Sequence, residues 1–166
     1  MKYLVTLGII AILSGCAGMA GIPPVTSIDR VFEIKGSSKD TIYESTKMWI
    51  AENFKSAKAV IEYEDKKGGT IIGNGSIKYP CSDMLDCTVK DDWRVLFTMR
   101  VDVKDTKIRL TFTNILLTWP PSNSSLSGHK GPIATQGVLD DVKPALLKIG
   151  DEIVAFIGNP KNSSDW

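Results

Sequence analysis

The chain has 166 residues, of which 43% are hydrophobic and 23% charged, and its mean hydropathy is close to zero. These values are typical of a folded globular domain and exclude a disordered or collagen-like chain. With 20 basic and 19 acidic side chains, the chain lacks the basic excess expected of a nucleic-acid-binding protein. The single histidine, His129, excludes a histidine-rich metal site.

The first 15 residues predict a bacterial signal peptide. Lys2 precedes an apolar run over residues 3–13, which is broken only by one threonine and one glycine. This run is too short to span a bilayer, which needs about 20 residues, but it matches the core of a signal peptide. Leu13-Ser14-Gly15-Cys16 then resembles the lipobox of bacterial lipoproteins. The sequence therefore predicts lipidation of Cys16, with an ordinary secretory signal as the alternative.

The residues after the lipobox predict a membrane tether. Residues 17–28 are uncharged and contain glycine and proline, so residues 16–28 are interpreted as the lipidated cysteine and its tether. Ala17 resembles the residue that directs Gram-negative lipoproteins to the outer membrane. We therefore expect a lipid-anchored protein of the bacterial envelope, facing the periplasm in a Gram-negative cell. A single domain is predicted over residues 29–158, followed by a tail over residues 159–166.

Two cysteines remain after the lipidated one. Cys81 and Cys87 lie in a polar segment, residues 80–92. An even number of cysteines in an oxidising compartment predicts a disulfide. Free thiols and an active redox pair are the alternatives, although a redox pair usually has two residues between its cysteines.

The body of the chain alternates between the periodicities of strands and helices. Alternating patterns predict strands over residues 29–34, 59–65, 70–79, 93–103 and 107–117. Apolar residues at helical spacing predict helices over residues 41–57 and 138–158.

These patterns also predict which side chains face the core. Ile61 and Tyr63 are expected on one face of their strand. In the last strand the side chains expected to point inward are Ile108, Leu110, Phe112 and Leu116. Pro144 and Gly150 predict a kink in the final helix or a later start.

The order β-α-β-β-β-β-α with short links predicts an α+β fold: a curved antiparallel sheet of about five strands with two helices on one face. This layout resembles a bacterial lipoprotein family of unknown function with a TATA-box-binding-protein-like fold. The resemblance rests on Phe32, Ile34, Trp49, the glycine-rich residues 69–75 and the strands over residues 93–103 and 107–114. It covers residues 29–115, supplies no catalytic residues, and implies nothing about DNA.

The outward face of the two longest strands is the candidate binding site. It is predicted to carry Arg94, Thr98, Arg100, Lys107, Arg109 and Thr111. Guanidinium groups with neighbouring hydroxyls suit an anionic lipid, a glycan or a partner protein. A solvated sheet face is the alternative.

Three other motifs favour ordinary structural roles. Gly73 and Gly75 fit no phosphate-binding pattern and predict close packing. His129 follows several serines, which leaves open a small hydrolase, but the context of a nucleophile is missing. The aspartates around the cysteines fit no calcium-loop spacing.

We therefore predict a membrane-anchored envelope lipoprotein with a binding or accessory role and no enzymatic activity. Its expected partners are the membrane, through Cys16, and an envelope protein, lipid or glycan. The alternatives are a phage- or plasmid-encoded exclusion lipoprotein that binds an envelope receptor, and a small envelope hydrolase. No cofactor, metal or nucleic acid is expected.

Overall fold

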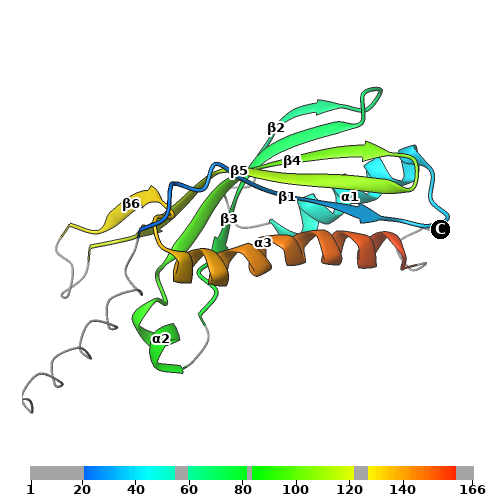
Figure 1. Ribbon diagram of the computed structural model, residues 1–166. Helices are drawn as coiled ribbons and strands as arrows, with labels where there is room; N and C mark the ends of the chain where they lie inside the picture. The colour runs from blue at the N-terminus through cyan, green and yellow to red at the C-terminus, as the bar shows by residue number, and fades with distance from the viewer. Residues whose placement is uncertain (1–20, 55–59, 82–83, 122–126, 160–166) are drawn as a thin grey trace, which may run out of the picture.

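The computed structural model describes residues 21–54, 60–81, 84–121 and 127–159. Within them the chain forms an open antiparallel sheet with helices packed on one face, which confirms the predicted α+β class (Figure 1). The elements are β1 (Ser27–Glu33), α1 (Lys39–Asn53), β2 (Val60–Asp65), β3 (Thr70–Lys78), α2 (Met84–Val89), β4 (Arg94–Lys104), β5 (Lys107–Trp119), β6 (His129–Pro132) and α3 (Gln136–Ile157). None of the described helices is both long and apolar enough to cross a membrane.

The sheet has the strand order β1-β5-β4-β3-β2, and β6 also pairs with β5. Since β4 pairs with β5 along nearly its whole length, β1 and β6 lie end to end on the other edge of β5. Both α1 and α3 pack on one face of this sheet, and no described helix covers the other face (Figure 1). The outer face of the sheet is therefore open.

The core lies between the sheet and these two helices. The inward side chains of β4 are Val95, Phe97, Met99, Val101 and Val103. The helices contribute Ile42, Tyr43, Trp49, Ile50, Val142, Leu146, Ile149 and Ile153. These side chains are at most 6% exposed, so the alternating and helical patterns identify the core correctly.

A bulge in β5 overturns one predicted orientation. Asn114 has a left-handed backbone with φ of 50°, and the register between β4 and β5 shifts beside it. One extra residue reverses which side chains face inward from that point on. Ile115 and Leu117 are therefore buried, whereas Leu116, which we expected in the core, lies opposite Leu96 on the open face.

A second bulge, in β2, separates two residues that were expected to share a face. Glu62 is the extra residue, because Ile61 pairs with Gly73 and Tyr63 with Ile72. Ile61 therefore points toward the helices, while Tyr63 turns to the open face and is 53% exposed.

Both helices differ from their predicted bounds. The Ser38 hydroxyl caps α1 by accepting from the Thr41 amide at 3.3 Å, and the helix ends four residues before the predicted position. For α3 we predicted a kink or a later start; the later start is wrong, since the helix begins at Gln136 and continues through Pro144. Pro144 is solvent-exposed, so the carbonyl that loses its amide partner faces water.

Two short elements and one boundary were not predicted. The polar segment around the cysteines contains α2, and β6 lies between β5 and α3; residues 122–126 lie outside the described residues. The folded domain begins before the predicted residue 29, since Gly21 bridges to Thr135 and β1 begins at Ser27. Cys16 and the signal segment also lie outside the described residues.

Candidate functional site

The structure places the predicted binding-face residues on the open face of the sheet. Across the strands, Arg100 lies opposite Thr111, Thr98 opposite Thr113, and Arg94 opposite Thr118. Arg109 lies opposite Asp102 in the same register. Paired residues in an antiparallel sheet project from the same face, so these side chains form one surface.

Arg100 on this face is held by an acidic neighbour. Its Nε donates to Asp102 Oδ2 at 2.9 Å and its Nη2 to Asp102 Oδ1 at 2.8 Å. The Thr70 hydroxyl adds a third hydrogen bond to the Asp102 carboxylate at 3.1 Å. The hydrogen bonds from Arg100 hold the pKa of Asp102 below its usual value. Arg100 is therefore a positioned, partly neutralised cation.

Polar side chains form a hydrogen-bonded row across four strands of the open face. The Thr98 hydroxyl donates to Asn74 Oδ1 at 2.8 Å and accepts from Asn114 Nδ2 at 3.2 Å. Asn74 Nδ2 in turn donates to the Glu62 carboxylate. Both β-strand bulges supply a member of this row, since Glu62 and Asn114 are the bulge residues. We call these four residues the polar row.

Arg94 contributes less to the surface than its charge indicates. Its Nη1 donates to the backbone carbonyls of Asp91 and Trp93, each at 3.1 Å. The guanidinium therefore braces the chain that enters β4. Sequence patterning places this residue on the correct face but does not show the local bond.

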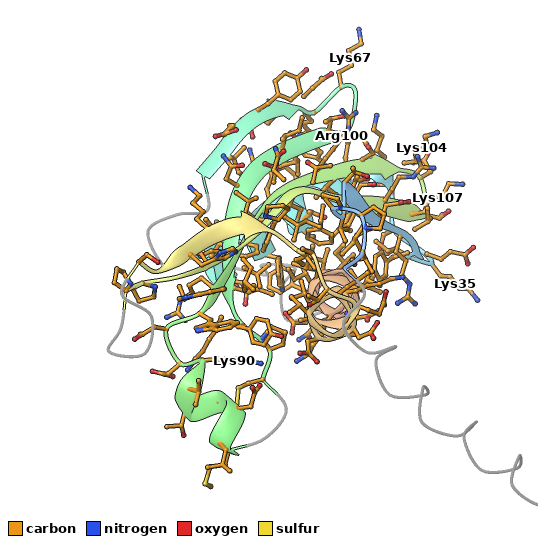
Figure 2. The ribbon with its side chains drawn as sticks, turned by 60° about the vertical axis from the view of Figure 1, so that its left-hand side comes forward. Lys35, Lys67, Lys90, Arg100, Lys104 and Lys107 are labelled. Carbon is orange, nitrogen blue, oxygen red and sulfur yellow. A yellow bond between two sulfur atoms is a disulfide. The ribbon has the colours of Figure 1, made fainter. Side chains whose placement is uncertain are left out.

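The turns at one end of the sheet bring together four lysines. The sequence pattern did not predict that they would lie close to one another. They are Lys35, Lys67, Lys104 and Lys107, which Figure 2 shows projecting along one side of the sheet. Among the described residues none of their side chains has an ion-pair partner. We call these four residues the lysine end.

Hydrogen bonds to the backbone of the turns explain this convergence. The Ile34 amide donates to the Thr106 carbonyl at 2.7 Å, and Lys39 Nζ donates to the Lys67 carbonyl at 2.7 Å. Glu33 and Asp105 lie in the same turns, so the surface is mixed in charge. Only Lys107 belonged to the predicted face, because the other lysines come from turns far apart in the sequence.

His129 is explained by packing. Its ring stacks on Trp119 with centroids 4.2 Å apart, and Trp119 stacks on Trp93 at 4.2 Å. The hydrolase alternative invoked three serines that precede His129; Ser124 and Ser125 lie outside the described residues, and Ser127 lies within them.

Gly75 lies where the sequence predicts close packing. A Cβ on Gly75 would lie 2.7 Å from the Phe97 ring on the neighbouring strand. Phe97 itself contacts Phe54 of the α1 cap and Phe112 edge-on. The glycine therefore makes room for an aromatic cluster inside the core.

Two of the aspartates near the cysteines are bound to lysines. Asp86 pairs with Lys90 at 2.6 Å, and Asp91 pairs with Lys78. Within the described ranges, no three potential ligands gather in a way that could hold a metal ion. The structure joins Cys81 and Cys87 in a disulfide at the base of α2.

Comparison with known families agrees with this geometry. A family described as a domain of unknown function (DUF4468) with a TBP-like fold matches residues 29–117. The chain belongs to this family. The resemblance seen in the sequence is thereby confirmed, and so is the expected fold.

Two solved structures share the fold. A DUF4468 family protein from Bacteroides ovatus is 18% identical, with a TM-score of 0.58 over 81% of this chain and 86% of that chain. A TBP-like protein from Parabacteroides distasonis is 14% identical, with a TM-score of 0.59 over 80% of this chain and 92% of that chain. A search of curated proteins finds no match. At these identities the similarity establishes the fold and not an activity.

Proposed function

We propose that this DUF4468 protein is a lipid-anchored lipoprotein of the bacterial envelope that binds a partner through the open face of its sheet, without catalysing a reaction. The observation that carries the proposal is the open face itself. It combines the polar row with a fixed Arg100–Asp102 pair and lies opposite the helices. Side chains held by one another keep their geometry without a ligand, which lowers the entropy lost on binding.

The membrane anchor is supported by the lipobox in the sequence and by the disulfide. Leu13-Ser14-Gly15-Cys16 supplies the lipobox, and Gly21 is already fixed to the domain by its bridge to Thr135. The Cys81–Cys87 disulfide fits an oxidising compartment. Cys16 carrying two or three acyl chains would be anchored stably, whereas a single chain binds a membrane only marginally.

Intact mass tests the anchor. The protein extracted from membranes is measured beside a Cys16→Ser variant. We expect the native protein to begin at residue 16 and to carry acyl chains, while the variant stays unprocessed. A native protein that keeps its first 15 residues, or carries no lipid, would contradict the anchor.

Photocrosslinking in cells tests the open face. Benzoylphenylalanine replaces Thr111 on the face and, as a control, the exposed Lys143 on α3. We expect a discrete crosslinked partner from position 111, at several times the yield from position 143. Equal yields at both positions would contradict a binding role for this face. A crosslinked phage or conjugation receptor would favour the exclusion alternative.

A further inference from the structure

The short helix α2 carries an unusual concentration of exposed apolar side chains. Met84, Leu85 and Val89 are 85%, 81% and 74% exposed. The other large apolar side chains exposed in the described residues, Val31, Met48 and Tyr63, lie between 46% and 53% and are scattered over three elements. Clustered apolar exposure marks a surface that meets something other than water.

The charged groups beside α2 point away from this apolar surface, and its exposed hydroxyl is bonded to the helix backbone. The Thr88 hydroxyl, which lies among the exposed residues, donates to the Met84 carbonyl at 2.8 Å. Asp86 and Lys90 pair with each other at 2.6 Å, and Lys90 Nζ lies 4.7 Å from the centre of the Tyr79 ring. Figure 2 shows Lys90 between α2 and the sheet. The helix is therefore amphipathic, with its apolar face turned outward.

Met84, Leu85 and Val89 form an exposed surface that we call the apolar tip. The apolar tip is held in a fixed position. The Cys81–Cys87 disulfide closes its base, and the Trp93 amide donates to the Lys90 carbonyl at 3.0 Å. The Tyr79 hydroxyl donates to Asp141 Oδ2 at 2.6 Å, which ties the start of this segment to α3. A six-residue helix has little stability of its own. These bonds therefore keep the helix folded and its apolar tip exposed.

The tip lies at the end of the molecule where the described chain begins. Gly21 bridges to Thr135, the N-cap of α3, and Tyr79 bonds to Asp141 in the second turn of the same helix. Figure 1 shows α2 projecting from the end that carries β6 and the start of α3. The lysine end, at the β4–β5 turn, lies at the far end of the sheet.

We propose that α2 is a second membrane contact, in which Met84, Leu85 and Val89 enter the interfacial layer of the bilayer that holds the lipid anchor. This inference rests on the proposed acylation of Cys16. Four residues separate Cys16 from Gly21, so the five Cα–Cα steps between them reach about 18 Å when fully extended. The end of the domain that carries α2 is therefore held against the membrane surface.

The partner is a lipid surface because the anchor and the apolar tip share this end of the domain.

The charged residues next to α2 determine whether the contact is apolar or electrostatic. Asp91 and Asp92 follow α2, and Asp91 is paired with Lys78. The contact would therefore depend on apolar burial and not on anionic headgroups. Insertion would turn the lysine end toward the aqueous side.

Photocrosslinking to lipid tests this contact. The processed protein is reconstituted into phosphatidylcholine vesicles with benzoylphenylalanine at position 85, and a matched variant carries it at Met48, an exposed apolar residue of α1. We expect phosphatidylcholine adducts at position 85 at five-fold or greater yield than at position 48. Melting temperatures within a few degrees of each other would show that both variants are folded.

The outcomes separate the tip from the anchor, because intact mass of the same sample reports acylation. Acylated protein whose position 85 labels lipid no more than position 48 overturns the α2 contact and leaves the anchor standing. Crosslinks from position 85 to a second copy of the chain overturn it as well. Unacylated protein whose position 85 still labels added vesicles supports the tip and overturns the anchor.

Discussion

The ring of Phe32 lies directly against the backbone of Gly150. A Cβ on residue 150 would lie 2.1 Å from Phe32 Cζ, a distance no real contact allows. Gly150 sits in the middle of α3, where glycine is otherwise unfavourable. The absence of a side chain at Gly150 lets β1 approach the helix. The sequence alone could not distinguish this packing role from a kink in the helix.

The first prediction follows from this contact. We expect Gly150→Ala to lower the free energy of unfolding by about 2 kcal/mol, because the buried Phe32 ring must move to admit the methyl group. Chemical denaturation followed by far-UV circular dichroism measures the change. Gly137→Ala is the control, since a Cβ there meets nothing within 4 Å. It should be neutral or stabilising by about 0.5 kcal/mol. Equal effects of both substitutions would contradict the packing role.

Removal of the Asp102 carboxylate should produce a pH-dependent loss of stability. The folded pKa of Asp102 lies below its unfolded value, chiefly because of the hydrogen bonds from Arg100. The pair therefore stabilises the fold above the unfolded pKa, near 4, and this contribution disappears as the pH falls through the folded pKa. Both side chains are partly exposed, so we expect Asp102→Asn to cost about 1 kcal/mol at pH 7.

A double-mutant cycle with Arg100→Gln measures this pair. Denaturation at pH 7 and at pH 3 should give a coupling free energy that shrinks at the lower pH. A coupling that stays constant between the two pH values would show that the interaction is not ionic. Asp105→Asn, in the β4–β5 turn, is a control that changes an acid outside this pair.

The sequence predicted more of the fold than of the site, for physical reasons. Strand and helix periods depend on local burial, so the core face of β4 could be read from alternation alone. The bulges at Glu62 and Asn114 have no comparable signal, because one extra residue reverses the pattern without changing its composition. The orientations of Tyr63 and Leu116 were wrong for this reason.

The surface sites depend on contacts that are distant in the sequence. Placement of Arg100 and Thr111 on one face follows from alternation, and Asp102 lies two residues from Arg100 on the same strand. The bonds from Thr98 to Asn74 and from Asn114 to Thr98, in contrast, join residues far apart in the chain. The lysine end could not be predicted from the sequence, because its residues come from three turns that meet only in the folded structure. The apolar tip of α2 was hidden because its six residues are too few to show helical periodicity.

Tyr79→Phe should loosen α2 and weaken the whole domain. Burial, followed by the hydrogen bond to Asp141, raises the pKa of Tyr79 above its usual value of about 10. The neutral hydroxyl therefore stabilises the fold below pH 10, and this contribution is lost as the pH rises through the folded pKa. We expect the variant to lose about 1 kcal/mol at pH 7.

Alkaline titration checks the Tyr79 prediction. Thermal melts of both proteins between pH 7 and pH 11 should begin to converge above pH 10, where Tyr79 ionises in the unfolded chain while its folded pKa remains higher. Amide exchange of α2 should be faster in the variant at neutral pH. A native protein whose advantage is unchanged at high pH would contradict the role of the hydroxyl.

Loss of the disulfide should act mainly on α2. The Cys81–Cys87 bridge closes a short loop, and the chain-entropy relation gives about 2 kcal/mol for a loop of this size. We expect Cys81→Ser with Cys87→Ser to speed amide exchange across α2, while the protected amides of β4 and β5 keep their pattern. Exchange by mass spectrometry measures both regions in one experiment. Unchanged exchange in α2 would show that Tyr79 and Lys90 suffice to hold it.

The turn between β4 and β5 contains a strained residue whose replacement should stabilise the protein. Thr106 has φ of 62°, in the left-handed region that β-branched residues avoid. Its carbonyl accepts from the Ile34 amide, so the turn cannot relax without losing a contact to the chain after β1. Asparagine tolerates this region, and Thr106→Asn should raise the free energy of unfolding by about 1 kcal/mol.

The matched control is Thr113→Asn, which makes the same chemical change in the extended backbone of β5. It should lower stability slightly, because asparagine is unfavourable in strands. The melting temperature should therefore rise by about 4 °C for Thr106→Asn. For the control it should fall slightly. A lower melting temperature for Thr106→Asn would mean that the threonine makes a stabilising contact that outweighs its backbone strain.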